Sequence, residues 1–470
     1  MTRREPNPFD PNRELVPLEL TFDGRSLPAL SGRERQEFDF LISLCDTEEI
    51  DGMVVWAREG FLHGLPAAAM DSERGHRDSA KVSLAGEKHS WIGTLPLVGQ
   101  WDRLAAEYEL GEDGRNWLNY YGTATSFHKS SKRHVFVTAD HRLLGERREG
   151  PFQNIWRSGQ IFSVREALML AGVATSAHGH LYEEVRQGYQ RRISTYSART
   201  DLAVAGLPNR RRIYAWLEQQ DPRNERIKSM KTLEQSLHER TAELLRAREG
   251  VQREDFRLAQ THATADEGLY HLRASVAAMA AACDSVAVLA ALALELPAVA
   301  ISRPQQISLR NSKFRTALRS NGGERIATAS EEAGAFMAMV KAFRDPIVHQ
   351  AGPTGSTVHH LGASQFAEMR ISSLSEEQVN SLRSLPGRAK TATEWGLRDA
   401  DHWPSIAPVA FLTRLALDGM RLLDVLLSAL ADDLRLPDNR DPQPVPVRRL
   451  QRIRLQIGFD PQYEDHSDAS

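Results

Sequence analysis

The sequence has little cysteine and no excess of positive charge, and both shortages limit what the protein can do. Only two of its 470 residues are cysteines, Cys45 and Cys283, and their wide separation forms no metal-binding or redox spacing. Such sparse cysteine use fits a reducing cytosol. Lysine and arginine total 59 against 62 aspartates and glutamates, so the net charge is −3. The chain therefore has no global basic field for nucleic acid, and any nucleic-acid site must be local.

Long apolar segments are also scarce. Residues 1–15 lack the apolar core of a signal peptide, so we expect a cytoplasmic protein without a membrane partner. Residues 274–294 hold a single charge, Asp284, over the length of a membrane span. Much of this segment is alanine, and an aspartate at its middle is costly in lipid. We therefore interpret it as the buried central helix of a bundle.

The pattern along the chain predicts five parts. Residues 1–15 are polar and contain several prolines, and we expect them to be flexible. Residues 16–180 alternate strands with helices, which predicts an α/β domain with a parallel sheet. Residues 181–260 are expected to form a basic linker and one long charged helix. Residues 261–435 show only helical patterns and predict an all-α helical bundle. Residues 436–470 form a tail rich in Pro, Asp and Arg, in which PVRRLQRIRLQIGF could add one strand.

The basic residues of 181–260 allow two interpretations. In the first, they form a solvated linker and the polar face of a helix. In the second, the arginines and lysines contact RNA phosphates while the scattered Tyr and Trp side chains stack on bases. The residue pattern leaves both open.

Acidic residues follow three predicted strands of the α/β domain. Asp23 follows VPLELTF, Glu59 follows GMVVWA, and Asp140 comes two residues after the strand in HVFVT. Parallel strands bring their carboxyl ends to one edge of a sheet, which is where α/β proteins place their chemistry. We therefore expect these carboxylates to converge. The alternative for Asp140 is a turn residue that caps the next helix.

Converging carboxylates imply a bound cation. Like charges repel, so such a cluster is stable only when a cation neutralises it. Oxygen ligands with water at the remaining positions suit Mg²⁺ or Mn²⁺. One or two such ions can activate water and stabilise a phosphodiester during displacement. Glu112 and Asp113, which precede the helix that leads into the last of these strands, are further candidate ligands.

This pattern of strands ending in acids, and above all VFVTADHRLL at 135–144, resembles the PIN domain, a metal-dependent nuclease fold. The resemblance covers residues 16–180 and implies RNA, or another single-stranded nucleic acid, as the partner. By this resemblance the metal-binding and catalytic acids would be Asp23, Glu59, Asp113 and Asp140, with Glu112 as an alternative ligand and Thr138 as a hydrogen-bonding support. DGRSL after the first strand and the long interval from Asp113 to Asp140 depart from the usual pattern, which leaves a degenerate site open.

A second motif lies in KAFRDPIVHQAG at 341–352. Arg344 could hold a phosphate and His349 could act as base and acid near neutral pH, so the pair could cleave RNA without a metal. The motif resembles the R-x(4–6)-H signature of HEPN domains, all-helical modules that include RNases. By this resemblance Arg344 and His349 would be catalytic, Asp345 would be their polar partner, and the chain would form a homodimer through its helical domain.

Helix geometry supplies an alternative for this motif. Five residues of an α-helix complete one turn and roughly 140° of the next, so Arg344 and His349 would not share a face of a straight helix. A helix that restarts at Pro346 behind an Asp345 cap would correct this. Otherwise the pair is structural, with Arg344 holding a carboxylate and His349 bonding a loop.

Three functional hypotheses follow. The first is a metal-dependent ribonuclease, of a toxin or antiphage-defence type by family association. The second is a non-catalytic RNA- or protein-binding module in which both folds are degenerate. The third is a metal-independent ribonuclease of the HEPN type.

Overall fold

The structure of the chain is a computed structural model that describes most of the sequence. The described residues are 17–58, 61–67, 95–96, 101–130, 135–149, 161–186, 189–255, 262–297, 307–349, 355–360, 367–372, 374–386, 388–398, 404–438 and 445–459. The chain forms two compact units. The N-terminal unit comprises residues 1–195, 360–367 and 451–470, and the helical unit comprises residues 196–359 and 368–450.

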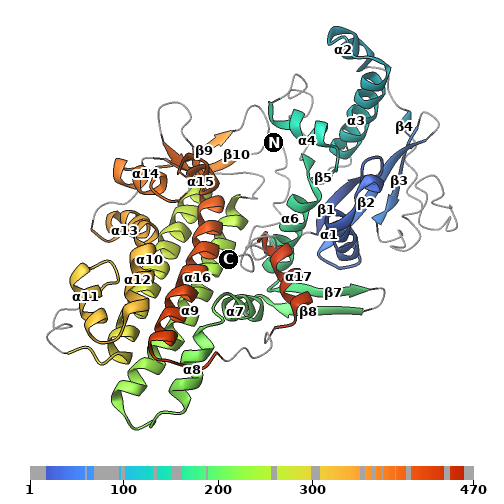
Figure 1. Ribbon diagram of the computed structural model, residues 1–470. Helices are drawn as coiled ribbons and strands as arrows, with labels where there is room; N and C mark the ends of the chain where they lie inside the picture. The colour runs from blue at the N-terminus through green and yellow to red at the C-terminus, as the bar shows by residue number, and fades with distance from the viewer. Residues whose placement is uncertain are drawn as a thin grey trace. The chain divides into compact units, whose positions relative to one another are not determined.

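A six-stranded sheet organises the N-terminal unit (Figure 1). Its strand order is β4-β3-β2-β1-β5-β6. The strands β2, β1, β5 and β6 are parallel, and β3 and β4 extend one edge in the antiparallel direction. Their bounds are β1 (Leu18–Asp23), β2 (Ile50–Arg58), β3 (Phe61–Pro66), β4 (Leu95–Pro96), β5 (Val135–Val137) and β6 (Ile161–Phe162). The predicted parallel sheet is confirmed, and the carboxyl ends of β1, β2 and β5 share one edge.

Helices cover this sheet. Successive side chains of β1 point to opposite faces of the sheet, so neighbouring residues contact different helices. Phe22 packs edge-on against Phe38 of α1 at 5.9 Å, whereas Asp23, the next residue, reaches α3. A Ser163–Glu166 capping box starts α6. The helices of this unit are α1 (Gly32–Leu44), α2 (Asp102–Glu107), α3 (Glu112–Ser130), α4 (His141–Glu149) and α6 (Val164–Ala177).

The segment expected to begin a basic linker forms an antiparallel hairpin instead. β7 (His180–Arg186) pairs with β8 (Tyr189–Ser194), so the linker expectation was wrong for these residues. The surrounding charges hid the apolar positions of the hairpin in the sequence. The buried carboxylate of Glu49 anchors β7, because it accepts a 2.7 Å hydrogen bond from the Tyr182 hydroxyl and lies 3.2 Å from His180 Nε2.

A helix, α17 (Val447–Ile457), stands where one added strand was expected, and that expectation was wrong. Its buried residues Leu450, Ile453 and Ile457 recur at helical spacing. The fully buried Gln456 completes the edge of β7: its Nε2 donates to Tyr182 O at 2.7 Å, and its Oε1 accepts from Tyr182 N at 2.9 Å. α6 lies against this point, since a Cβ added at Gly172 would come 1.9 Å from Gln456 O.

The helical unit is built around two long helices that pack along each other, α9 (Glu225–Asp255) and α10 (His262–Ala293). The helix α16 (Pro408–Asp433) packs on both of them. The remaining helices are α7 (Thr195–Gly206), α8 (Arg210–Glu218), α11 (Ser312–Ser320), α12 (Glu324–Glu332), α13 (Gly334–His349), α14 (Glu376–Arg383) and α15 (Arg388–Glu394). The chain is therefore an α/β region followed by a mostly helical region, as predicted.

Within the described ranges, α10 is the one helix long and apolar enough to cross a membrane by length and composition. Of its apolar window, 67% is buried inside the structure. The core helix of a soluble bundle passes the same test of length and composition. Burial therefore supports the interpretation of this segment as the central helix of a bundle.

A small sheet also occurs where only helices were expected. It has four strands in the order β11-β12-β10-β9, namely β9 (Gly355–His360), β10 (Ala367–Ser372), β11 (Leu397–Arg398) and β12 (Ser405–Ile406). The expectation of no strands in 261–435 was wrong. Strands as short as β11 and β12 carry no detectable alternation, which is the main signal for a strand.

Gly172→Ala is expected to destabilise the N-terminal unit, because the added Cβ would clash with the backbone of Gln456. Overpacking of this kind costs about 1–3 kcal/mol. Gly145→Ala in α4 is the matched control, since nothing lies within 4 Å of a Cβ there and alanine favours a helix. Hydrogen exchange of the β7 amides in the full chain measures the difference. Equal protection in the two variants would contradict the packing of α17 against α6 and β7.

Candidate functional site

The carboxylate of Asp23, at the end of β1, is fully buried and fully hydrogen-bonded. Its Oδ1 accepts from the Tyr120 hydroxyl at 2.7 Å and from Arg25 N at 3.0 Å. Its Oδ2 accepts from Thr138 Oγ1 at 2.7 Å and from the Tyr121 hydroxyl at 2.8 Å. A carboxylate has about four lone-pair positions, so protein donors occupy all of them.

Thr138 joins the two neighbouring strands at this edge. Its single hydroxyl proton goes to Asp23, so the hydroxyl can only accept from its other partners. It accepts from Asp140 N at 3.0 Å and from Ser26 Oγ at 3.1 Å, and Ser26 Oγ accepts in turn from Ala139 N at 2.9 Å. In this series of hydrogen bonds Ser26 donates to Thr138, and Thr138 donates to Asp23. These contacts are the geometric basis for a supporting role of Thr138 at the strand end.

Asp140 lies at the same edge and caps α4. Its Oδ1 accepts from Leu143 N at 2.8 Å, and its Oδ2 accepts from Trp117 Nε1 at 3.1 Å. This is the capping arrangement stated above as the alternative for Asp140. The adjacent strands β1 and β5 thus bring Asp23 and Asp140 to one place, and each carboxylate is bonded to protein donors there.

Three aromatic residues of α3 build this site, and sequence reasoning missed them. Trp117, Tyr120 and Tyr121 are buried and recur at positions i, i+3 and i+4, which places them on one face of the helix. Burial, followed by the charge of Asp23, raises the pKa of Tyr120 and of Tyr121 above the ordinary tyrosine value. Both phenols therefore stay protonated near neutral pH and act as donors. The signal that could have found them is the stretch WLNYY.

Two arginines lie over these rings. Arg25 Cζ is 5.3 Å from the ring centre of Tyr120 and 6.0 Å from that of Tyr121. Arg142 Cζ is 4.1 Å from the ring centre of Trp117. Both arginines are exposed, so the edge combines the buried Asp23, the half-buried Asp140 and the buried phenols with guanidinium groups at the surface.

The other predicted acids are not brought to Asp23 in the described part of the chain. Glu112 and Asp113 are exposed in the first turn of α3. They precede Tyr120 by eight and seven positions, or about 10–12 Å along the helix axis. Negative charge is favourable at a helix N-terminus, which accounts for both acids there. Glu59 lies outside the described residues.

The described residues do not fit a bound Mg²⁺ or Mn²⁺ as they are arranged. Asp23 has no lone pair left for a metal, and its neighbours are hydroxyl and amide donors where a cluster would need further carboxylates. Among the described residues, no group of three or more His, Cys, Asp or Glu side chains could hold a metal ion. The metal hypothesis therefore lacks a ligand set in this part of the chain.

The second motif lies on one continuous helix. α13 runs from Gly334 to His349 with Pro346 inside it, so of the two options for this motif the helix restart at Pro346 is not found. A proline in an established helix removes one hydrogen bond without always ending the helix. Asp345 lies 3.6 Å from Lys341 Nζ one turn earlier. The side chain of His349 lies outside the described residues.

Arg344 has an acidic neighbour on another helix. Burial raises the pKa of Asp284 on α10. The positive charges of Arg344 and of Arg240 on α9 act in the opposite direction and limit this rise. Arg344 is half-buried at this place. This charge interaction agrees with the structural alternative, in which Arg344 lies near a carboxylate of the chain.

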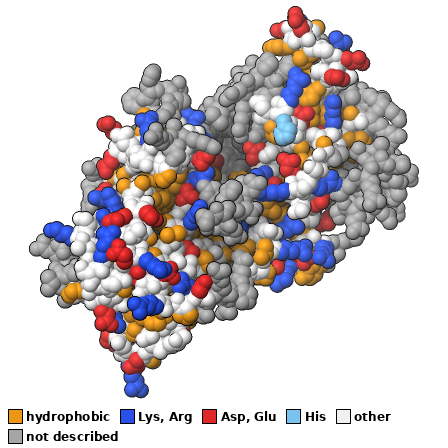
Figure 2. All heavy atoms as spheres, in the orientation of Figure 1, with side chains coloured by type: hydrophobic (Ala, Val, Ile, Leu, Met, Phe, Trp, Pro, Cys, Tyr) orange, Lys and Arg blue, Asp and Glu red, His pale blue; other side chains and the backbone are white. Residues whose placement is uncertain are grey.

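The basic residues of 181–260 are largely paired with carboxylates of the chain itself. In the hairpin, Arg191 lies 3.1 Å from Glu183 and Arg186 lies 2.5 Å from Glu184. The pairs in the helical unit include Arg210–Glu234, Arg212–Asp432, Arg226–Glu295, Lys228–Glu225 and Lys231–Glu218. Figure 2 shows positive and negative side chains interspersed on the face in view. This pairing favours a structural role for the segment over a strip that contacts RNA.

Alkaline pH is expected to weaken the N-terminal unit. The raised pKa values of Tyr120 and Tyr121 mean that the folded state holds their protons more tightly than the unfolded state, where tyrosine titrates near 10. Their contribution to stability is therefore complete below about pH 10 and is lost as pH rises beyond it. Urea unfolding of the full chain from about pH 8 to about pH 11, followed by near-UV circular dichroism, measures the decline.

Tyr121→Phe separates this effect from other alkaline titrations. The variant is less stable near neutral pH, because Asp23 loses a hydrogen bond that is worth about 1.5–3 kcal/mol for a charged acceptor. It should also lose less stability than the wild type above pH 10. Tyr189→Phe, at a side chain that is 52% exposed, is the matched control and should leave both quantities unchanged. Parallel pH profiles for all three proteins would contradict the donor role of Tyr121.

Comparisons with known proteins identify no family for this chain. No family model matches it. No curated protein and no solved structure matches it either. The description of the chain therefore rests on its own structure, an N-terminal parallel α/β sheet followed by a largely helical region.

Proposed function

We propose that the N-terminal unit is a nuclease-like module that binds single-stranded nucleic acid and does not hydrolyse it with a metal ion. The observation that carries the proposal is the occupation of every lone-pair position of Asp23 by hydroxyl and amide donors. Hydrogen bonds to the ionised form stabilise a buried carboxylate, as a cation would in a cluster of acids. Asp23 therefore needs no metal to be stable in the interior.

The nucleic-acid part of the proposal has three supports. Open α/β sheets bind their ligands at the carboxyl ends of the strands. The VTADHRLL stretch at that edge resembles PIN domains, which implies RNA or single-stranded nucleic acid as the ligand. The exposed Arg25 and Arg142 supply positive charge at the same place.

The two ribonuclease alternatives each have a structural requirement. Metal-dependent hydrolysis would need Asp23 to exchange at least one hydroxyl donor for the ion, with Glu59 supplying a further oxygen. Metal-independent cleavage would need Arg344 to be free to hold a phosphate despite the nearby charge of Asp284. Toxin or antiphage-defence action, and dimerisation through the helical unit, belong to these alternatives.

Incubation of the full chain with a labelled pool of RNA and single-stranded DNA tests the proposal. We expect retention of the nucleic acid without cleavage, both with Mn²⁺ and with EDTA. Cleavage that requires Mn²⁺ and is lost in Asp140→Asn would replace the proposal with the metal-dependent ribonuclease. Cleavage that persists in EDTA, yields 2′,3′-cyclic phosphate ends and is lost in His349→Ala would move the activity to the helical unit.

The stability of Asp23→Asn in metal-free buffer is an independent test. If the Asp23 carboxylate serves to accept hydrogen bonds from the protein, the free energy of unfolding of the variant falls by about 2 kcal/mol or more. The reason is that the new amide group faces hydroxyls that donated to the carboxylate. If Asp23 is a metal ligand within a cluster of acids, the substitution relieves repulsion and leaves the metal-free protein equally or more stable. Asp113→Asn is the matched control, since Asp113 is exposed and its charge is worth about 0.3–1 kcal/mol at a helix N-terminus. A neutral or stabilising Asp23→Asn would favour the metal site.

A further inference from the structure

We propose that Arg25 and Arg142 form a binding site for the phosphates of a single-stranded nucleic acid at the carboxyl edge of the sheet. This inference rests on the proposed function and adds to it the residues that bind and the chemical group that they recognise. Arg25 follows β1 by two residues, and Arg142 lies in the first turn of α4. Asp23 and Asp140 thus each have an arginine two positions later in the chain.

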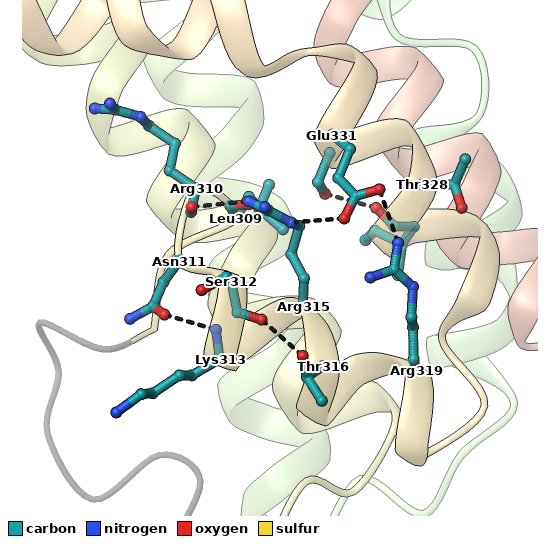
Figure 3. Close-up of polar contacts among 12 residues, drawn as sticks. Leu309, Arg310, Asn311, Ser312, Lys313, Arg315, Thr316, Arg319, Thr328 and Glu331 are labelled. Carbon is teal, nitrogen blue, oxygen red and sulfur yellow. Dashed lines mark hydrogen bonds and ion pairs between the residues drawn. The ribbon is translucent and has the colours of Figure 1, made fainter.

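Arg25 and Arg142 have no carboxylate partner among the described residues. Many arginines elsewhere are neutralised by the chain itself. In the helical unit, for example, Arg315 and Arg319 both point to Glu331, at 3.3 and 2.9 Å (Figure 3). The exposed guanidinium groups of Arg25 and Arg142 carry charge that is available to a ligand.

Aromatic rings hold both guanidinium groups in place. Arg142 Cζ lies 4.1 Å from the ring centre of Trp117, and Trp117 lies 5.3 Å from the ring of Tyr121. The ring of Tyr121 is in turn 6.0 Å from Arg25 Cζ, so a continuous row links the two arginines. Stacking uses the face of a guanidinium and leaves its in-plane N–H groups free to bind phosphate oxygens. Because the side chains are already ordered, binding loses less conformational entropy.

The burial of the rings indicates which part of a nucleic acid is recognised. Trp117 is 6% exposed and Tyr121 is fully buried, so bases cannot stack on them. The accessible groups are the arginines and the exposed His141, which suit phosphate oxygens. Asp23 lies beneath them with no exposure, and Asp140 is bonded to Leu143 N and Trp117 Nε1. The site therefore reads the phosphodiester backbone and not the base sequence.

Salt-dependent binding of a labelled oligo(U) of about 16 nucleotides to the full chain tests this site. Each released counterion contributes to the slope of log K against log salt, so Arg25→Ala and Arg142→Ala should each reduce the slope by about 0.7, and the double variant by about 1.4. Arg142→Lys should keep the slope and weaken binding, because an ammonium lacks the planar fork of donors. Arg33→Ala, at an arginine bonded to Glu37 within α1, is the matched control and should match the wild type.

The outcomes separate this site from the function on which it rests. Absence of binding by the wild type would overturn the proposed function and the site together. Binding that persists unchanged in a folded Arg25→Ala, Arg142→Ala double variant would overturn the site and leave the proposed function standing. A preference of about tenfold between oligo(U) and oligo(A) would contradict recognition of the backbone. Displacement of oligo(U) by inorganic phosphate at matched ionic strength would identify a single phosphate as the ligand in place of a chain.

Discussion

The burial of the Asp23 carboxylate is the constraint on which the N-terminal unit depends. An ionised carboxylate in the interior is tolerated only when hydrogen bonds replace the water that it loses. Here the donors come from the turn after β1, from α3 and from the end of β5. Meeting this one requirement therefore fixes β5 beside β1 and sets the rotation of α3 over the sheet. It also places Thr138 and Asp140, since the threonine hydroxyl that donates to Asp23 accepts from Asp140 N.

Hydrogen bonds of buried polar side chains also join other segments that are distant in the sequence and belong to the same unit. Glu49 anchors the β7–β8 hairpin through Tyr182, and Gln456 pairs with both backbone groups of the same residue from the opposite end of the chain. In the helical unit, Asp433 accepts from Arg325 N and Ile326 N and so caps α12 from the end of α16. Polar side chains that could have served a ligand are largely used to hold the fold together. Arg25 and Arg142 are therefore informative, because they are exposed, lie against aromatic rings and have no carboxylate partner among the described residues.

The parts of the fold that followed from sequence are those whose signal lies within one element. The apolar strands of the parallel sheet and the long buried α10 each carry a local pattern. The hairpin did not follow, because its contact with Glu49 leaves no local pattern. α17 did not follow either, although its apolar residues Leu450, Ile453 and Ile457 stand at helical spacing. Charge dominated the composition of both segments and masked the apolar positions that the folded chain buries. The small sheet of the helical unit was missed in part because two of its strands, β11 and β12, have only two residues each.

The candidate site shows the same limit in a sharper form. An aspartate at the end of a strand can bind a metal, cap a helix or accept hydrogen bonds in the interior. Asp23 and Asp140 could therefore be found from sequence, but the sequence did not distinguish between these roles. What separates these roles is the chemistry of the residues opposite them. Carboxylates opposite Asp23 would require a cation, whereas the tyrosines of α3 and Thr138 supply protons and make a cation unnecessary. The positions that distinguish a hydrogen-bonded Asp23 from a metal-bound one are therefore Tyr120 and Tyr121, about a hundred residues from the aspartate that they contact.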